Sequence, residues 1–338
     1  MPELRLPTPP RRHLLSIRDL ERADVERVLD TAQSLAASLD REVKKLPTLR
    51  GRTVVNLFYE SSTRTLASFE LAAKRLSADT MSVRSAGSSV DKGESLKDTA
   101  LTLAAYDPDV IVVRHPSVGA PALVARYAGA HVVNAGDGKH QHPTQALLDL
   151  YTMRDALGRL EGLTVAIVGD VLHSRVARSL VQALGLVGAH ALLVAPPTLL
   201  PRGIEALGCV ATTHVGAIGD ADVIYVLRMQ AERMAPGEAF VPSLREYSAL
   251  YGITPERVMP GQVVMHPGPM NRGVEIDPRV ADSDAALVSE QVRAGLVVRM
   301  AILYDLVAQR PVRDGGPGEA ARGNREVPPA FTGAPEMA

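Results

Sequence analysis

The chain of 338 residues is 46% hydrophobic and 22% charged, enough to bury a substantial core in about two domains of roughly 150 residues each. Its 37 Lys and Arg residues nearly balance its 38 Asp and Glu residues, which excludes binding to nucleic acid or to an anionic membrane through overall charge. Cys209 is the single cysteine and excludes an internal disulfide, so we expect a reducing, cytoplasmic setting. Any anion-binding site must therefore be formed locally.

Short apolar runs alternate with helical patterns through the first half of the chain. After a helix predicted at about residues 19–39, strand-like runs occur at 53–58, 80–83, 109–113 and 131–134, and each precedes a helix-like segment. This alternation is typical of a parallel sheet covered by helices.

The alternation restarts in the second half, with strand-like runs at 163–170, 189–195, 221–227 and 262–266. The long uncharged run 179–201 is interrupted by glycines and a proline pair, so we interpret it as a buried helix and strand instead of a membrane span. The predicted fold class is therefore α/β, with two doubly wound domains that each have a mainly parallel sheet covered by helices.

A long helix predicted to start at Pro143 lies between the two sets of strands and marks the expected domain junction. We expect a first domain of residues 1–145 and a second domain of residues 146–283. A last helix, 284–309, is expected to pack back on the first domain. The tail 311–338 holds five Pro and five Gly with almost no aliphatic residues, which is typical of disorder.

Hydroxyl side chains and a guanidinium crowd onto one turn directly after the first predicted strand. Apolar residues at helical spacing follow this turn, so it lies at a helix N-terminus, where unpaired N–H groups and the positive dipole end converge. Neutral donors and one bidentate fork are matched to a phosphate group, and the alternative is a helix cap beside a surface arginine. The residues of this turn are Ser61, Ser62, Thr63, Arg64 and Thr65.

A polar, glycine-containing loop at 85–94 follows the second strand of the first sheet and is long enough to project from its own domain. Ser88 and Lys92 could reach an anion from this loop. The alternative is a solvated loop without a ligand, because loops both carry function and tolerate polar residues.

Arg114 follows a predicted strand, and the carboxyl ends of strands are where open α/β sheets place their ligands. His142 and Gln145 begin the helix at Pro143, a residue suited to the first helical position, so both can face one pocket. His140 and His142 lack a nearby third ligand, and we therefore expect no metal.

Arg175 and Arg228 also come at the ends of strands in the second half, and Gln230 lies beside the latter. The alternative for each arginine is a surface ion pair. Only Gly169 of a G-x-G-x-x-G fingerprint is present, which disfavours a dinucleotide cofactor.

The segment 266–273 is too rich in Pro and Gly for a regular element and predicts a rigid loop whose carbonyls, around Gly268 and Pro269, can face a ligand. No Gly-x-Ser-x-Gly, His-Glu-x-x-His or Walker A motif occurs in the sequence.

These motifs, in this order and at compatible spacing, resemble the carbamoyltransferase family over about residues 13–308. The ornithine branch of the family carries His-Cys-Leu-Pro where this chain has His266-Pro-Gly-Pro269. Arg228 suits a second carboxylate and would repel an ammonium group, so the aspartate branch fits better. The motifs are Ser62 to Thr65, Ser88 with Lys92, Arg114 to Pro116, His142 to Gln145, Arg175, Arg228 with Gln230, and His266 to Pro269.

The resemblance implies a transferase that moves the carbamoyl group of carbamoyl phosphate to the amino group of L-aspartate. The products are N-carbamoyl-L-aspartate and phosphate, an early step of de novo pyrimidine biosynthesis, and no cofactor takes part. The implied catalytic residues are Arg64, Thr65, Lys92, Arg114 and His142. Those for carbamoyl phosphate are Ser62, Thr63, Arg64, Thr65, Ser88, Arg114, His142, Gln145, Gly268 and Pro269, and those for aspartate are Lys92, Arg175, Arg228 and Gln230.

The resemblance also implies a homotrimer with shared active sites, in which Ser88 and Lys92 come from the neighbouring chain. Residues 1–145 with the last helix would then bind carbamoyl phosphate, and residues 146–283 would bind aspartate. Regulatory chains or a dihydroorotase as further partners, and a noncatalytic scaffold as a rival function, stay open. Many members have Arg in place of Leu66, where we expect altered packing with phosphate binding retained. Many also have Leu in place of Gly268, so the shape of that pocket wall stays open.

Overall fold

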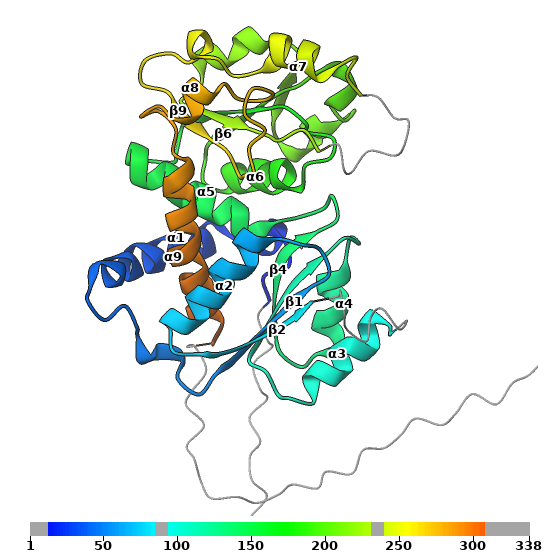
Figure 1. Cartoon of the computed structure of the whole chain (residues 1–338), viewed down its shortest axis with the longest axis vertical. Helices are drawn as coiled ribbons and strands as arrows, with labels where there is room; N and C mark the ends of the chain where they lie inside the picture. Colours follow the sequence, from blue (N-terminus) through cyan, green and yellow to red (C-terminus); the bar gives the residue numbers. More distant parts are fainter. Residues whose placement is uncertain (1–12, 85–93, 231–239, 308–338) are drawn as a thin grey trace, which may run out of the picture.

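Figure 1 shows the computed structural model, which describes residues 13–84, 94–230 and 240–307. Two parallel sheets lie one above the other, and helices cover them. The strand orders are β2-β1-β3-β4 and β7-β6-β5-β8-β9, so the predicted fold class is confirmed.

The first sheet consists of β1 (Thr53–Phe58), β2 (Asp79–Arg84), β3 (Val110–His115) and β4 (His131–Asp137). The second consists of β5 (Thr164–Val168), β6 (His190–Val194), β7 (Val210–Thr212), β8 (Val223–Val226) and β9 (Val263–Met265). The α-helices are α1 (Arg22–Ala36), α2 (Thr63–Arg75), α3 (Leu96–Ala104), α4 (Ala120–Tyr127), α5 (Pro143–Leu157), α6 (Arg175–Leu186), α7 (Leu244–Tyr251), α8 (Pro278–Ala281) and α9 (Val288–Val307).

Both faces of the first sheet are buried, which explains why its inner strands read as continuous apolar runs. Because side chains alternate along a strand, neighbouring residues of β1 enter different cores. Val54 belongs to the large core that includes Phe69 of α2 and Val298 of α9. Val55 belongs to a separate core with Leu103 of α3 and further residues of α4.

The structure differs from the predicted elements at three points. The second sheet has a fifth strand, β7, and 3-10 turns follow β6 where a helix would be the usual connection. The last helix begins at Val288, four residues later than predicted. The reason is that the preceding residues pair with β9: the N–H of Val264 donates to Ala285 O at 2.7 Å, and the N–H of Leu287 donates to Val264 O at 2.8 Å.

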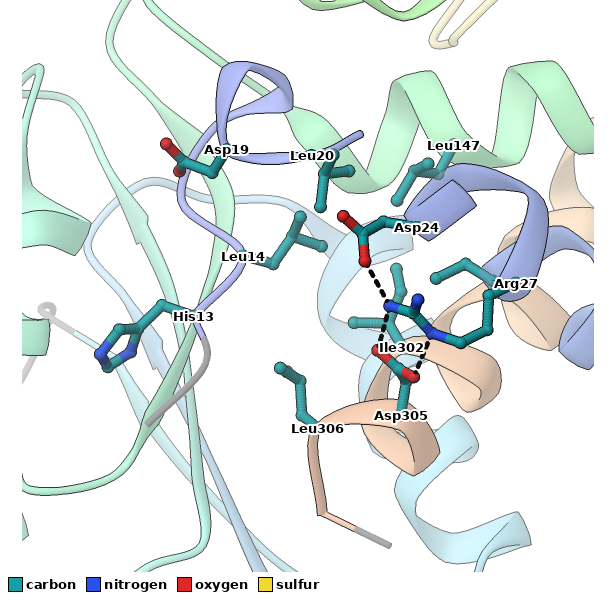
Figure 2. A pocket seen from close by; sticks show the side chains of 11 residues that line it. His13, Leu14, Asp19, Leu20, Asp24, Arg27, Leu147, Ile302, Asp305 and Leu306 are labelled. Carbon is teal, nitrogen blue, oxygen red and sulfur yellow. Dashed lines mark hydrogen bonds and ion pairs between the residues drawn. The ribbon is translucent and has the colours of Figure 1, made fainter. Parts of the chain in front are cut away.

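Helix α9 returns from the second sheet and packs against α1, α2 and α5 (Figure 1). Arg27 of α1 donates from Nε to Asp305 of α9 at 2.8 Å and pairs with Asp24 at 2.7 Å (Figure 2). These ion pairs border a cavity of about 170 Å³ whose apolar wall includes Ile302 and Leu306. No helix among the described residues has both the length and the apolar character needed to cross a membrane.

Candidate active site

Each sheet has a point at which the chain switches direction, and ligands of open α/β sheets bind outside such points. In the first sheet β1 lies between β2 and β3, and in the second β5 lies between β6 and β8. The predicted residues follow these strands: Ser62 to Thr65 come after β1, Arg114 ends β3, Arg175 follows β5, and Arg228 follows β8. The strand order, which the sequence does not state, therefore supports one site between the two carboxyl edges.

Ser62 is the N-cap of α2, and no side chain caps the first turn of this helix. Oγ of Ser62 donates to Oγ1 of Thr65 at 3.0 Å, and the carbonyl oxygen of Ser62 accepts from the N–H of Leu66 at 3.0 Å. The leading N–H groups of a helix have no intrahelical acceptor and lie at the positive dipole end. The turn thus lies at a helix N-terminus, as its sequence predicts, and Leu66 is packed in the core.

Arg64 extends from α2 across to the loop after β9. A Cβ atom built on Gly268 would lie only 2.8 Å from Cζ of Arg64, so the guanidinium rests against the bare backbone of this glycine. Burial lowers the pKa of Arg64, and the nearby cation of Arg228 lowers it further. Arg64, Arg228 and the Gly268 loop therefore lie together although they come from different sheets.

Glu60 joins two of the predicted arginines. Its Oε1 accepts from Nη2 of Arg114 and from Nη2 of Arg175, both at 2.7 Å, and its Oε2 accepts from Nη1 of Arg175 at 3.0 Å. Arg175 also donates to Gly138 O at 3.2 Å and lies against Gly136, whose Cβ position is 2.8 Å from Cζ of Arg175. The sequence analysis missed Glu60, and the only available signal was an acid at a strand end that otherwise carries cations.

His142 and Gln145 lie at the start of α5 and are both buried. The N–H of His142 donates to Oγ of Ser179 on α6 at 2.8 Å. Gln145 donates from Nε2 to Oδ1 of Asp149 at 3.0 Å. The backbone of His142 and the side chain of Gln145 are thus held by partners from the interior.

Asp149 on α5 is a buried carboxylate that joins this helix to β8 and α9. It accepts from Oη of Tyr225 on β8 at 2.7 Å and from Nε2 of Gln291 on α9 at 2.8 Å, in addition to Gln145. Burial raises the pKa of Asp149 to about 7, against the opposing effect of these hydrogen bonds. The sequence analysis missed this network because Asp149 looks like any polar residue on a helix.

The loop after β9 is held from within, as predicted for a rigid loop. The N–H of Gly268 donates to Nδ1 of His266 at 2.8 Å, so the ring proton lies on Nε2 and faces Glu275 at 3.3 Å. Oε1 of Gln291 accepts from the N–H of His266 at 2.8 Å. Burial lowers the pKa of His266, which keeps the ring neutral in this role. Pro269 follows in the same loop and is exposed.

Gln230 is fixed by a buried acid at the end of β5. Its N–H donates to Oδ2 of Asp170 at 3.2 Å, and Nδ1 of His173 contacts Oδ1 of the same carboxylate at 2.8 Å. Ser88 and Lys92 lie outside the described residues. Within the described ranges, no group of three or more His, Cys, Asp and Glu side chains is placed to hold a metal ion.

The fold and this arrangement define a class: an α/β protein of two parallel sheets with arginines gathered between their carboxyl edges. The family model for the carbamoyl-P binding domain of aspartate/ornithine carbamoyltransferase matches residues 12–155, and the model for the Asp/Orn binding domain matches residues 161–306. The chain belongs to the aspartate/ornithine carbamoyltransferase family.

Relatives of known name and structure agree with this family. The aspartate carbamoyltransferase catalytic subunit of Acidothermus cellulolyticus is 55% identical over 323 residues, 94% of this chain and 97% of that protein. That of Salinispora arenicola is 57% identical over 303 residues, 88% of this chain and 98% of that protein. Aspartate transcarbamoylase of Trypanosoma cruzi, solved with carbamoyl aspartate and phosphate, has a TM-score of 0.79 at 32% identity, covering 87% of this chain and 95% of that chain.

Proposed function

We propose that the protein transfers the carbamoyl group of carbamoyl phosphate to the amino group of L-aspartate, in de novo pyrimidine biosynthesis. The observation that carries this proposal is the approach of Arg64, at the uncapped start of α2, to Arg228 and the Gly268 loop of the other sheet. A phosphate group and a dicarboxylate supply the negative charge that these cations need. The names of the relatives support the same substrates.

In this proposal carbamoyl phosphate binds at the edge of the first sheet. The backbone and hydroxyl groups of Ser62, Thr63 and Thr65 receive the phosphate together with the fork of Arg64. Around the carbamoyl group lie the remaining residues proposed for this substrate, which are Arg114, His142, Gln145 and the Gly268-Pro269 backbone. Ser88 completes the phosphate site from a neighbouring chain.

Aspartate binds at the edge of the second sheet in this proposal. Arg175 and Arg228 take its two carboxylates, and Gln230 assists them. Lys92 of a neighbouring chain contacts both substrates. Glu60 accepts from Arg175 and so fixes the position of the guanidinium that receives the substrate carboxylate in this proposal.

The reaction forms a C–N bond between the amine and the carbamoyl carbon and breaks the C–O bond to the phosphate. The attack creates a tetrahedral oxyanion while the leaving phosphate gains charge, so preorganised donors stabilise the transition state more than the substrates. Holding both substrates between the two sheets replaces a bimolecular encounter with a local one. Arg64, Thr65, Lys92, Arg114 and His142 are the proposed catalytic residues.

We also propose that residues 1–145, with the last helix, form the domain for carbamoyl phosphate and that residues 146–283 form the domain for aspartate. The packing of α9 against α1 and α2 supports the assignment of the last helix. The protein would act in the cytoplasm, in keeping with its single cysteine.

A homotrimer with shared sites is part of the proposal, because Ser88 and Lys92 are expected to act on a neighbouring chain. Mixing inactive Lys92→Ala chains with inactive Arg64→Ala chains should then restore activity through sites that receive both intact residues. If confirmed subunit exchange gives no recovery, each chain is self-sufficient. The mass of the native assembly would show whether regulatory chains or a dihydroorotase join it.

The decisive experiment is an assay for carbamoylated product with carbamoyl phosphate and either aspartate or ornithine. We expect product from aspartate alone. Product from ornithine alone would assign the protein to the other branch, and product from neither would favour a noncatalytic scaffold.

A further inference from the structure

A second cavity, of about 300 Å³, lies where the segment before α5 meets α6 and the 3-10 turn after β6. Its walls come from both parts of the chain: Arg18, His140 and Gln141 on one side, and Arg178, Gln182, residues 201–204 and residues 206–207 on the other. Cavities of this size accommodate small ligands. None of the residues proposed for the two substrates lines it.

The cavity is cationic. Arg18, Arg178 and Arg202 line it, and none of the three forms an ion pair with a described carboxylate. Asp19, which follows Arg18, lines the other cavity instead (Figure 2). His140 adds a fourth basic group, and its Nδ1 contacts Oδ2 of Asp137 at 3.0 Å. Several cations around one concave surface raise the local concentration of anions.

Arg178 is held in place by several hydrogen bonds. Its guanidinium donates to three backbone carbonyls, of Lys139, Ser174 and Leu172, each at 3.2 Å. Carbonyls fix the fork in place but carry no full negative charge, and the carboxylate of Asp170 acts on the fork only from beyond ion-pair distance. Burial lowers the pKa of Arg178, and an anion bound beside it would offset this effect.

An amide completes the polar wall. Gln141 donates from Nε2 to Oε1 of Gln182 at 3.2 Å, and its own Oε1 accepts from Oγ of Ser179 at 2.9 Å. Among the described residues Nε2 of Gln182 has no hydrogen-bond acceptor, and it remains a neutral donor at the cavity. The opposite wall, with Ile204 and Leu207, is apolar.

We propose that this cavity is a second anion site, separate from the substrates, that binds a diphosphate or triphosphate group. Three arginines line one cavity and form no ion pair with a described carboxylate. They suit a compact polyanion better than a single carboxylate, because each guanidinium can pair with its own oxygens. The ligand is either free polyphosphate or the same group carried by a larger molecule that also covers the apolar wall.

The site is connected to the candidate active site through α6. Arg175 and Arg178 lie one turn apart, and they hold the successive carbonyls of Gly138 and Lys139. Ser179 of the same helix holds the N–H of His142. A polyanion would therefore fasten α6 to the segment that carries His142, and by linkage the substrates would alter its affinity. This coupling, unlike the binding itself, rests on the proposed function.

Calorimetric titration with inorganic pyrophosphate tests the site in an Arg64→Ala protein, in which the phosphate cradle of α2 is impaired. We expect one pyrophosphate per chain, bound more tightly than inorganic phosphate. Adding Arg202→Gln should weaken binding about tenfold, as loss of one charge-assisted pair predicts, whereas adding Arg50→Gln at an exposed position should not. No binding, equal binding of phosphate, or an unchanged affinity in the Arg202→Gln protein would overturn the site.

Two further measurements identify the ligand and the coupling. A nucleoside triphosphate that binds more tightly than pyrophosphate supports a carried group, and weaker binding supports free polyphosphate. In the wild-type chain at saturating carbamoyl phosphate, pyrophosphate should change the KM for aspartate, and Arg202→Gln should remove that change with basal turnover intact. Absence of carbamoyl transfer would refute the proposed function and leave the calorimetric result standing.

Discussion

The carboxyl edges of the two sheets both present arginines, but they fix their anion-binding groups in different ways. At the first edge the start of α2 offers backbone N–H groups and short hydroxyls, whose positions are set once the helix forms. At the second edge Arg175 is held by Glu60, a residue of the other sheet, and Gln230 is held by the buried acid Asp170.

This difference indicates which structural changes should weaken the binding of each substrate. A helix N-terminus binds an anion mainly through backbone N–H groups, so few side-chain rotamers have to be ordered. A long arginine side chain, in contrast, must be immobilised by partners before it can bind the anion. The proposed phosphate site can thus be built within the first sheet alone. The proposed aspartate site requires the two sheets to approach each other, so changes at their junction should affect aspartate more than carbamoyl phosphate.

The largest expected effect concerns the junction itself, through the protonation of Asp149. Its folded pKa of about 7 lies above the ordinary value of 3.8, so the folded state binds the extra proton and the free energy of unfolding falls as pH rises from about 4 to about 7. The total for this one buried group is about 4 kcal/mol. Denaturant unfolding over this range should show that contribution to the slope in the wild type and lose it in Asp149→Asn.

Asp155→Asn is the matched control, because Asp155 lies on the same helix and is exposed. Its stability should run parallel to that of the wild type. If the Asp149→Asn and wild-type curves are parallel as well, the buried carboxylate does not titrate in this window. The stability of the junction between the two sheets would then not depend on the protonation of Asp149.

Arg64→Ala tests the first edge. Loss of one preorganised donor to the phosphate or the developing oxyanion costs about 3 kcal/mol, a fall of about a hundredfold in turnover, with thermal unfolding unchanged. Steady-state kinetics measure this against Arg50→Ala, whose exposed side chain forms no hydrogen bond or ion pair with the described residues. A variant that keeps more than about a tenth of the wild-type rate would contradict the assigned role.

Much of the first edge was predictable from sequence. Hydroxyls and Arg64 before an apolar 3.6-residue repeat predict a helix start, and structure places that start at Thr63 with Ser62 as the cap. The arginines at strand ends were predictable for the same reason, since parallel strands end at one edge of their sheet. Local patterns suffice where local backbone builds the site.

The second edge was less predictable because its partners are distant in sequence. Glu60 meets Arg175 across 115 residues, and Gln291 meets Asp149 across 142 residues. Such contacts leave no periodicity to detect, and each residue taken singly looks like an ordinary polar side chain at the surface. The strand order also depends on packing that cannot be read from a single sequence, and the two switch points follow from that order.

Glu60→Gln sharpens the comparison at the second edge. The change removes the charge that holds Arg175 and Arg114, and for this partly exposed carboxylate we expect a loss of about 2 kcal/mol, or about thirtyfold in kcat/KM for aspartate. The KM for carbamoyl phosphate should change less. Glu26→Gln, which removes an exposed ion pair with Arg22, is the control and should have little effect.

A double-mutant cycle makes this test specific. In an Arg175→Gln background the loss from Glu60→Gln should shrink, because the partner is already absent. Equal losses in both backgrounds would show that Glu60 acts independently of Arg175, and the difference between the edges would then need another cause.

The smallest expected effect concerns Gly268. Gly268 has a φ of +64°, and a Cβ there would lie 2.8 Å from Cζ of Arg64. Gly268→Ala should therefore displace the guanidinium and raise the KM for carbamoyl phosphate about fivefold, close to 1 kcal/mol.

Gly51→Ala is the matched control, since Gly51 has a φ of +74° with nothing within 4 Å of its Cβ position. Both changes carry a similar backbone strain of about 1 kcal/mol, so their stabilities should fall together while only the first alters the KM. A KM that stays at the wild-type value in Gly268→Ala would mean that Arg64 reaches the phosphate without support from this loop, and the first edge would then be independent of the second.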